Sequence, residues 1–113
     1  MSASHIRRQT LAELRKTIQA MMSPAWDLAL QGRTRAEVNQ AARTLLAAQR
    51  ARLRLENAEL AEIRDKLAAN EADLAKGIQG LDRALRTLKG VTAVLAAAAG
   101  LLRAVGRVIN LAV

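Results

Sequence analysis

The chain has 113 residues, no cysteine, one histidine and a formal net charge of +8. This length suits one domain or one rod with a tail, and the lack of cysteine excludes disulfides and thiolate metal sites. Alanine and leucine supply 25 and 18 residues while phenylalanine and tyrosine are absent, which favours helices over strands. We therefore predict an all-α fold: a long helical hairpin with a coiled-coil-like rod and an apolar C-terminal helix.

Residues 1–33 predict a basic amphipathic helix. Apolar side chains recur every three or four residues from Leu11 to Leu28, which places them on one face. Ser23–Pro24 predicts a kink or restart, because proline suits the first turn of a helix and serine the cap before it. Gly32 is a typical C-terminal stop. No uniform apolar run follows the basic start, so we expect no secretory signal and an intracellular protein.

Residues 34–89 predict a long helix that begins with a capping box, Thr34 to Glu37. If residues 35–89 formed one helix, it would be roughly 80 Å long. A row of leucines repeats every seven residues, and we expect it to mediate helix association: Leu46, Leu53, Leu60, Leu67, Leu74, Leu81 and Leu88. The alternative is a hinge at Gly77–Gly80, where the rod would fold back into a compact three-helix domain.

The other seam of this heptad is mostly polar, and only Ile78 and Leu85 near its end are apolar. If the leucines occupy d positions, Arg43, Arg50 and Asn57 occupy a positions, where polar residues weaken a coiled coil. A strong parallel homodimer along the full length is therefore not expected. Small alanines beside the first leucines would instead let the first helix fold back antiparallel through the turn at 31–34. Because alanines bury little area each, we expect a homo-oligomer or a helical protein partner.

The sequence shows no catalytic, metal-binding or cofactor-binding pattern, so we expect a non-enzymatic protein without a small-molecule substrate. The only histidine, His5, lies near the N-terminus, where no nucleophile or metal cluster surrounds it in the sequence. Four arginines at helical spacing could contact phosphates: Arg43, Arg50, Arg54 and Arg64. Acidic side chains lie among them and no aromatic residue is available to stack on bases, so nucleic acid is the less favoured partner.

Residues 90–113 predict an apolar amphipathic helix. Residues 91–113 are long enough to cross a bilayer, but Arg103 and Arg107 lie near the middle and make a solitary span marginal. Helical projection places both arginines on a face of small residues. Lys89, Arg103 and Arg107 would meet lipid headgroups or a pore lumen. The expected membrane or partner contacts lie on the other face: Val94, Leu95, Leu101, Leu102, Val105, Val108 and Ile109.

Three uses of this C-terminal helix stay open. It could lie in the bilayer interface, insert as an oligomer, or pack on other helices of a soluble assembly. The leading hypothesis is a self-associating helical protein that engages an anionic membrane through this helix, peripherally or integrally at the inner face. The alternative is a soluble helical structural subunit of a larger assembly, such as a phage or bacterial particle, whose partner covers the helix. Nucleic-acid binding through the arginines is the third hypothesis.

Overall fold

The computed structural model describes residues 2–86 and 90–111, and over these residues it contains helices and no strands. The all-α prediction is confirmed. The helices in chain order are α1 (Ala3–Met21), α2 (Pro24–Leu30), α3 (Arg35–Asn57), α4 (Leu60–Ala69), α5 (Glu71–Leu85) and α6 (Val91–Gly106).

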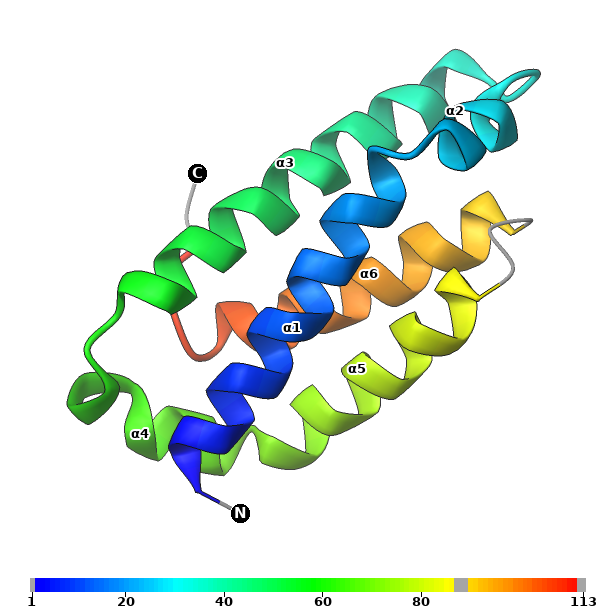
Figure 1. Ribbon diagram of the computed structural model, residues 1–113. Helices are drawn as coiled ribbons and strands as arrows, with labels where there is room; N and C mark the ends of the chain where they lie inside the picture. The colour runs from blue at the N-terminus through cyan, green and yellow to red at the C-terminus, as the bar shows by residue number, and fades with distance from the viewer. Residues whose placement is uncertain (1, 87–89, 112–113) are drawn as a thin grey trace.

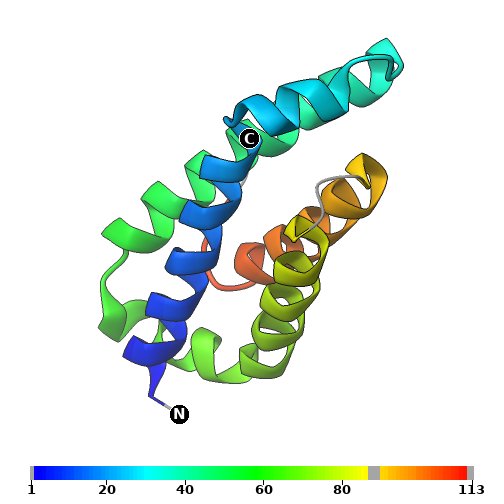
Figure 2. The same ribbon diagram turned by 45° about the vertical axis from the view of Figure 1, so that its right-hand side comes forward.

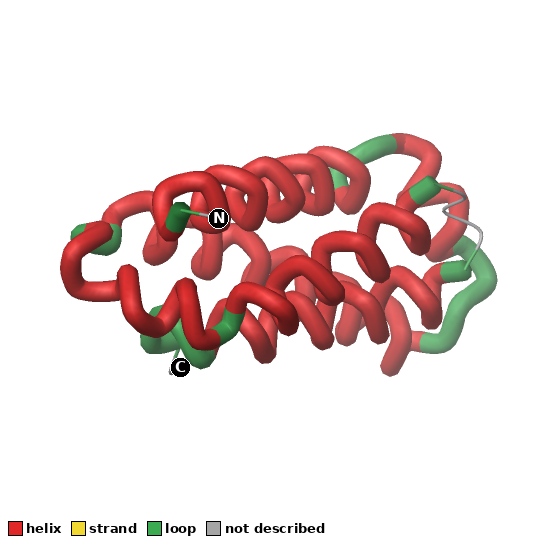
Figure 3. Tube along the Cα trace, turned by 90° about the horizontal axis from the view of Figure 1, so that it is seen from below, coloured by secondary structure: helices red, strands yellow, loops and turns green. Residues whose placement is uncertain are grey.

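Helices α1, α3, α5 and α6 pack into an elongated bundle, and the chain measures 45 × 27 × 18 Å along its principal axes (Figure 1). Helix α1 packs against α3 and α5, and α6 packs against the same two helices from the other side. Helices α1 and α3 form one pair and α5 and α6 another when the bundle is turned (Figure 2). The loops lie mainly at the two ends of the bundle (Figure 3). The outer side of α6 therefore faces away from α1, between α3 and α5.

The first connections follow the local sequence signals. Ser23 caps α2, which begins at Pro24, because its hydroxyl accepts a hydrogen bond from the backbone N–H of Trp26. Gly32 adopts a φ of +82°, a left-handed conformation that favours glycine. The Thr34 hydroxyl accepts from the backbone N–H of Glu37 at 3.2 Å and caps α3. The first helical segment thus folds back on α3, as the turn at 31–34 predicts.

The expected single helix over 35–89 is divided into α3, α4 and α5. The first break is at Ala58, whose ψ of 139° is extended. The Ala58 carbonyl oxygen accepts a hydrogen bond of 2.8 Å from Nη1 of Arg7, a residue of α1. The second break is at Asn70, whose side-chain amide donates to the carbonyl of Lys66. Because these breaks fold the stretch back on itself, no 80 Å rod forms within the monomer.

The leucine row consequently faces two different environments. Leu67, Leu74 and Leu81 are buried in the core, and Leu60 packs partly buried against it. Leu46 and Leu53 of α3 are exposed instead, at 47% and 49% of their surface. Leu88 lies outside the described residues. The core side of α3 is formed by a different set: Ala41, Ala48, Ala51 and Leu55.

The hinge considered at Gly77–Gly80 is absent, because both glycines lie within α5. Gly77 has a packing role there. A Cβ atom at this position would lie only 3.1 Å from the Cα and 3.2 Å from Cδ1 of Leu101. The missing side chain therefore permits α5 and α6 to approach closely.

Candidate functional site

The outer side of α3 carries an alternating row of arginine and leucine that we call the α3 seam: Arg43, Leu46, Arg50 and Leu53. Successive members are three or four residues apart, so they are neighbours on the helix surface. All four side chains are exposed. Neither arginine forms an ion pair with another described residue, whereas Arg33 and Arg52 of the same region pair with Glu37 and Glu56. The seam thus presents uncompensated positive charge beside apolar surface.

The α3 seam is exposed because alanines, and not its leucines, make the close contacts of α3 with the bundle. Ala48 and Ala51 are fully buried, and their small side chains let neighbouring helices approach the α3 backbone. Leu46 and Leu53 point the other way. Of the leucines expected to mediate association, these two are therefore the ones that the described monomer leaves exposed.

Of the four arginines predicted to contact phosphate, three lie together on α3 and one lies on α4. Arg43, Arg50 and Arg54 lie on one flank of α3, at spacings of seven and four residues. Arg54 donates a hydrogen bond to the carbonyl of Asn110, just beyond α6, so this flank borders α6. Arg64 is separated from the row because it lies on α4, beyond the break at Ala58.

The apolar residues predicted to contact a membrane or partner pack inside the monomer. Leu102 is partly buried, and the other six are buried in the core: Val94, Leu95, Leu101, Val105, Val108 and Ile109. Helix α6 packs mainly against α5 and α3, and Val105 and Val108 also lie beside Thr10 of α1 and Leu67 of α4. No helix among the described residues is both long enough and apolar enough to cross a membrane.

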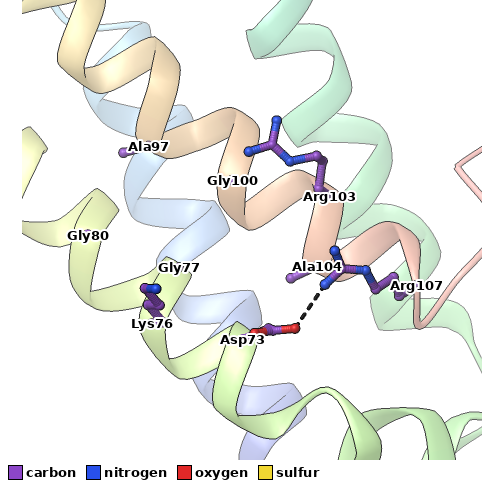
Figure 4. A pocket seen from close by; sticks show the side chains of 9 residues that line it. All are labelled: Asp73, Lys76, Gly77, Gly80, Ala97, Gly100, Arg103, Ala104 and Arg107. Carbon is purple, nitrogen blue, oxygen red and sulfur yellow. Dashed lines mark hydrogen bonds and ion pairs between the residues drawn. The ribbon is translucent and has the colours of Figure 1, made fainter.

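A basic groove of about 330 Å³ lies between α5 and α6 (Figure 4). Lys76 contributes from α5 and Arg103 and Arg107 from α6, while Lys89, grouped with the two arginines in the sequence, lies outside the described residues. Nη1 of Arg107 donates across the groove to Oδ2 of Asp73 at 2.9 Å. The Arg103 guanidinium lies beside the turn of Gly100, away from Asp73 (Figure 4). Arg103 has no ion-pair partner among the described residues.

The floor of the groove consists of small residues: Gly77, Gly80, Ala97, Gly100 and Ala104. At Gly80 and at Gly100 an added Cβ would meet no atom within 4 Å. These two glycines therefore do not serve helix packing, in contrast to Gly77, and their missing side chains hollow the groove. The sequence did not point to Lys76 or Asp73, and it singled out Gly80 only as part of a hinge, because only the α5–α6 hairpin brings these residues beside Arg103.

One buried carboxyl group lies outside both surfaces. Glu13 of α1 is 6% exposed, and its Oε2 has no hydrogen-bond partner among the described residues. Burial raises the pKa of Glu13 above its ordinary value of 4.5, an effect that the charge of Lys16 partly offsets. Lys16 itself is paired with Asp82 of α5. Sequence reasoning missed Glu13, because its position among α1 residues does not reveal that neighbouring helices cover it.

The described residues contain no cluster of three or more histidine or acidic side chains that could hold a metal ion. His5 lies in the first turn of α1, where its backbone N–H donates to the hydroxyl of Ser2. Comparison of the chain with protein-family models, curated proteins and solved structures finds no significant match. The case for a function therefore depends on the α3 seam and the basic groove.

Proposed function

We propose that the protein binds the surface of anionic membranes peripherally, through the α3 seam, and has no catalytic activity. The observation that carries this proposal is the alternation of two exposed leucines with two arginines that have no ion-pair partner among the described residues. A helix that lies in a bilayer interface needs such a surface. Its leucines enter the acyl boundary and its arginines stay at the level of the phosphates.

A second copy of the chain suits the α3 seam less well than an anionic lipid surface does. If two copies packed together through their α3 helices, Arg43 and Arg50 of one copy would lie near the same two arginines of the other. Like charges repel across such a contact. A lipid surface of opposite charge removes this repulsion. Self-association, if present, would then use a surface other than the seam.

Nucleic acid would satisfy the arginines but leave the leucines without a role. Leu46 and Leu53 are the outward apolar members of the seam, and phosphates offer no apolar contact to them. The chain's only aromatic residue, Trp26, is 2% exposed and cannot stack on bases. The combination of charge with exposed apolar surface thus favours lipid.

The strength of the contact suits reversible binding. Each arginine near an anionic surface contributes about 1 kcal/mol. Full burial of a leucine contributes about 1.5–3 kcal/mol, and the seam leucines would be only partly covered. In this proposal the apolar side of α6 stays in the core, so binding does not require the bundle to open.

Vesicle flotation tests the proposal. The full chain should float with vesicles that contain phosphatidylglycerol and stay unbound with phosphatidylcholine alone. Arg43→Gln with Arg50→Gln should lower the partition coefficient about 30-fold, which corresponds to about 2 kcal/mol. The control pair, Arg8→Gln with Arg64→Gln, changes the net charge equally on exposed positions of α1 and α4.

A second pair of variants separates apolar contact from charge. Leu46→Ser with Leu53→Ser should weaken flotation, whereas Leu28→Ser should not, although Leu28 of α2 is 66% exposed. Equal losses from the seam and control arginine pairs would overturn the proposal, because binding would then follow net charge alone. Tighter binding to duplex DNA than to anionic vesicles would also overturn it.

A further inference from the structure

The basic groove between α5 and α6 is built differently from the α3 seam. It is concave, its charged groups come from two helices, and its floor has no side chains larger than alanine. From this we propose that the groove is a binding site for a phosphate monoester. This inference does not depend on membrane binding by the seam, because a soluble ligand tests it.

The charge of the groove matches such a ligand. Lys76, Arg103 and Arg107 contribute three positive charges and Asp73 one negative charge, so the net charge is +2. A phosphate monoester carries −1.5 to −2 near neutral pH and offers three acceptor oxygens. Arginine and lysine are the side chains that proteins use to hold such groups. A phosphodiester, with one negative charge, would leave the groove positively charged.

The existing ion pair does not block the site. The side chains of Arg107 and Asp73 are 56% and 60% exposed. A pair this exposed contributes little free energy, so a phosphate can recruit Arg107 at small cost. Arg103 is available without breaking any ion pair with the described residues.

The two unpacked glycines give the site its shape. A glycine in the middle of a helix costs about 1 kcal/mol relative to alanine. Gly77 recovers this cost through close packing on Leu101, but nothing is packed over Gly80 or Gly100. What they provide is space beside the cations. The groove volume of about 330 Å³ is at the small end of ligand sites, which suits a headgroup-sized ligand.

The first test is titration of the full chain with glycerol 3-phosphate, followed by amide and guanidinium NMR signals. We expect saturable shifts at Gly100, Arg103 and Arg107, with tighter binding as the pH rises through about 6, where the ligand loses its second proton. Arg103→Gln should weaken binding about tenfold or more. Asp73→Asn should tighten it, because the groove loses its only carboxylate.

Gly100→Leu fills the groove and should abolish binding, while Ala61→Leu, at an exposed position of α4, should not. Circular dichroism confirms that each variant is folded. If Gly100→Leu unfolds the chain, Gly100→Ala serves in its place and should weaken binding. Absence of saturable shifts in the native chain, or weaker binding by Asp73→Asn, would overturn the proposal.

Flotation on vesicles with phosphatidic acid, a monoester, and with phosphatidylglycerol, a diester, at equal surface charge identifies the source of the phosphate. A preference for phosphatidic acid that Arg103→Gln removes assigns the site to a lipid headgroup. Binding of glycerol 3-phosphate without that preference assigns it to a soluble phosphate monoester. Both outcomes support the site, and neither depends on Leu46 or Leu53.

Discussion

The leucines that recur every seven residues differ in exposure between α3 and α4–α5. In α3 the row faces solvent, and the core side is made mostly of alanines. In α4 and α5 the row enters the core at Leu67, Leu74 and Leu81. The two halves differ because the breaks at Ala58 and Asn70 redirect the chain between them. A periodic pattern therefore predicts which residues share a face, but not which face of a helix its neighbours cover.

We expect the largest difference between the two halves of the row when one leucine of each is truncated to alanine. Leu81→Ala removes a buried side chain and should lower the free energy of unfolding by about 2–5 kcal/mol. Leu53→Ala should change it by less than about 0.5 kcal/mol, because that side chain is half exposed. Urea unfolding of both variants measures the difference. Similar losses would mean that the α3 row is covered in solution, for example by self-association.

A smaller effect distinguishes two glycines within the buried half. Gly77→Ala places a Cβ 3.1 Å from the Leu101 backbone, so the α5–α6 contact must widen at a cost of about 1–3 kcal/mol, less about 1 kcal/mol gained in helix propensity. Gly80→Ala meets no atom within 4 Å and should stabilise the fold by about 1 kcal/mol. The net change for Gly77→Ala is thus a loss of about 0–2 kcal/mol, so thermal unfolding should show an equal or lower Tm for Gly77→Ala and a higher Tm for Gly80→Ala. A stabilising Gly77→Ala would show that close approach is not required.

The smallest effect concerns α1, which packs against both halves of the row. Because burial raises the pKa of Glu13, the folded state binds its proton more tightly than the unfolded chain. The Glu13 contribution to stability is therefore fully present below pH 4.5 and is lost as the pH rises through the higher, folded pKa. Glu13→Gln should remove this decline and raise stability at neutral pH. Urea midpoints across this range test it, and an unchanged pH profile would contradict it.

Local signals in the sequence predicted the ends of helices better than their arrangement. Ser23–Pro24, Gly32 and Thr34 act where expected because capping and left-handed glycine depend on neighbouring residues alone. The break at Ala58 could not be predicted, since no proline or glycine marks it and its carbonyl is held by Arg7, 51 residues away.

The candidate sites were likewise predictable only where they depend on residues that are close in the sequence. The arginine–leucine spacing of the α3 seam could be read from the sequence, whereas its exposure depends on how α3 packs. For the basic groove, Arg103 and Arg107 were identifiable as cations on a small-residue face. Their neighbours Lys76 and Asp73 were not, because the α5–α6 hairpin alone brings them together.

The position of α6 in the chain has a consequence for biosynthesis. This helix emerges from the ribosome after the other five, yet its side chains fill the centre of the bundle between α3 and α5. In a nascent chain that ends at α5, Leu74 lacks its neighbours Val105 and Val108, so apolar surface of the bundle stays exposed as in aggregation-prone folding intermediates. The bundle can therefore be completed only after Ile109 has been synthesised and has left the exit tunnel.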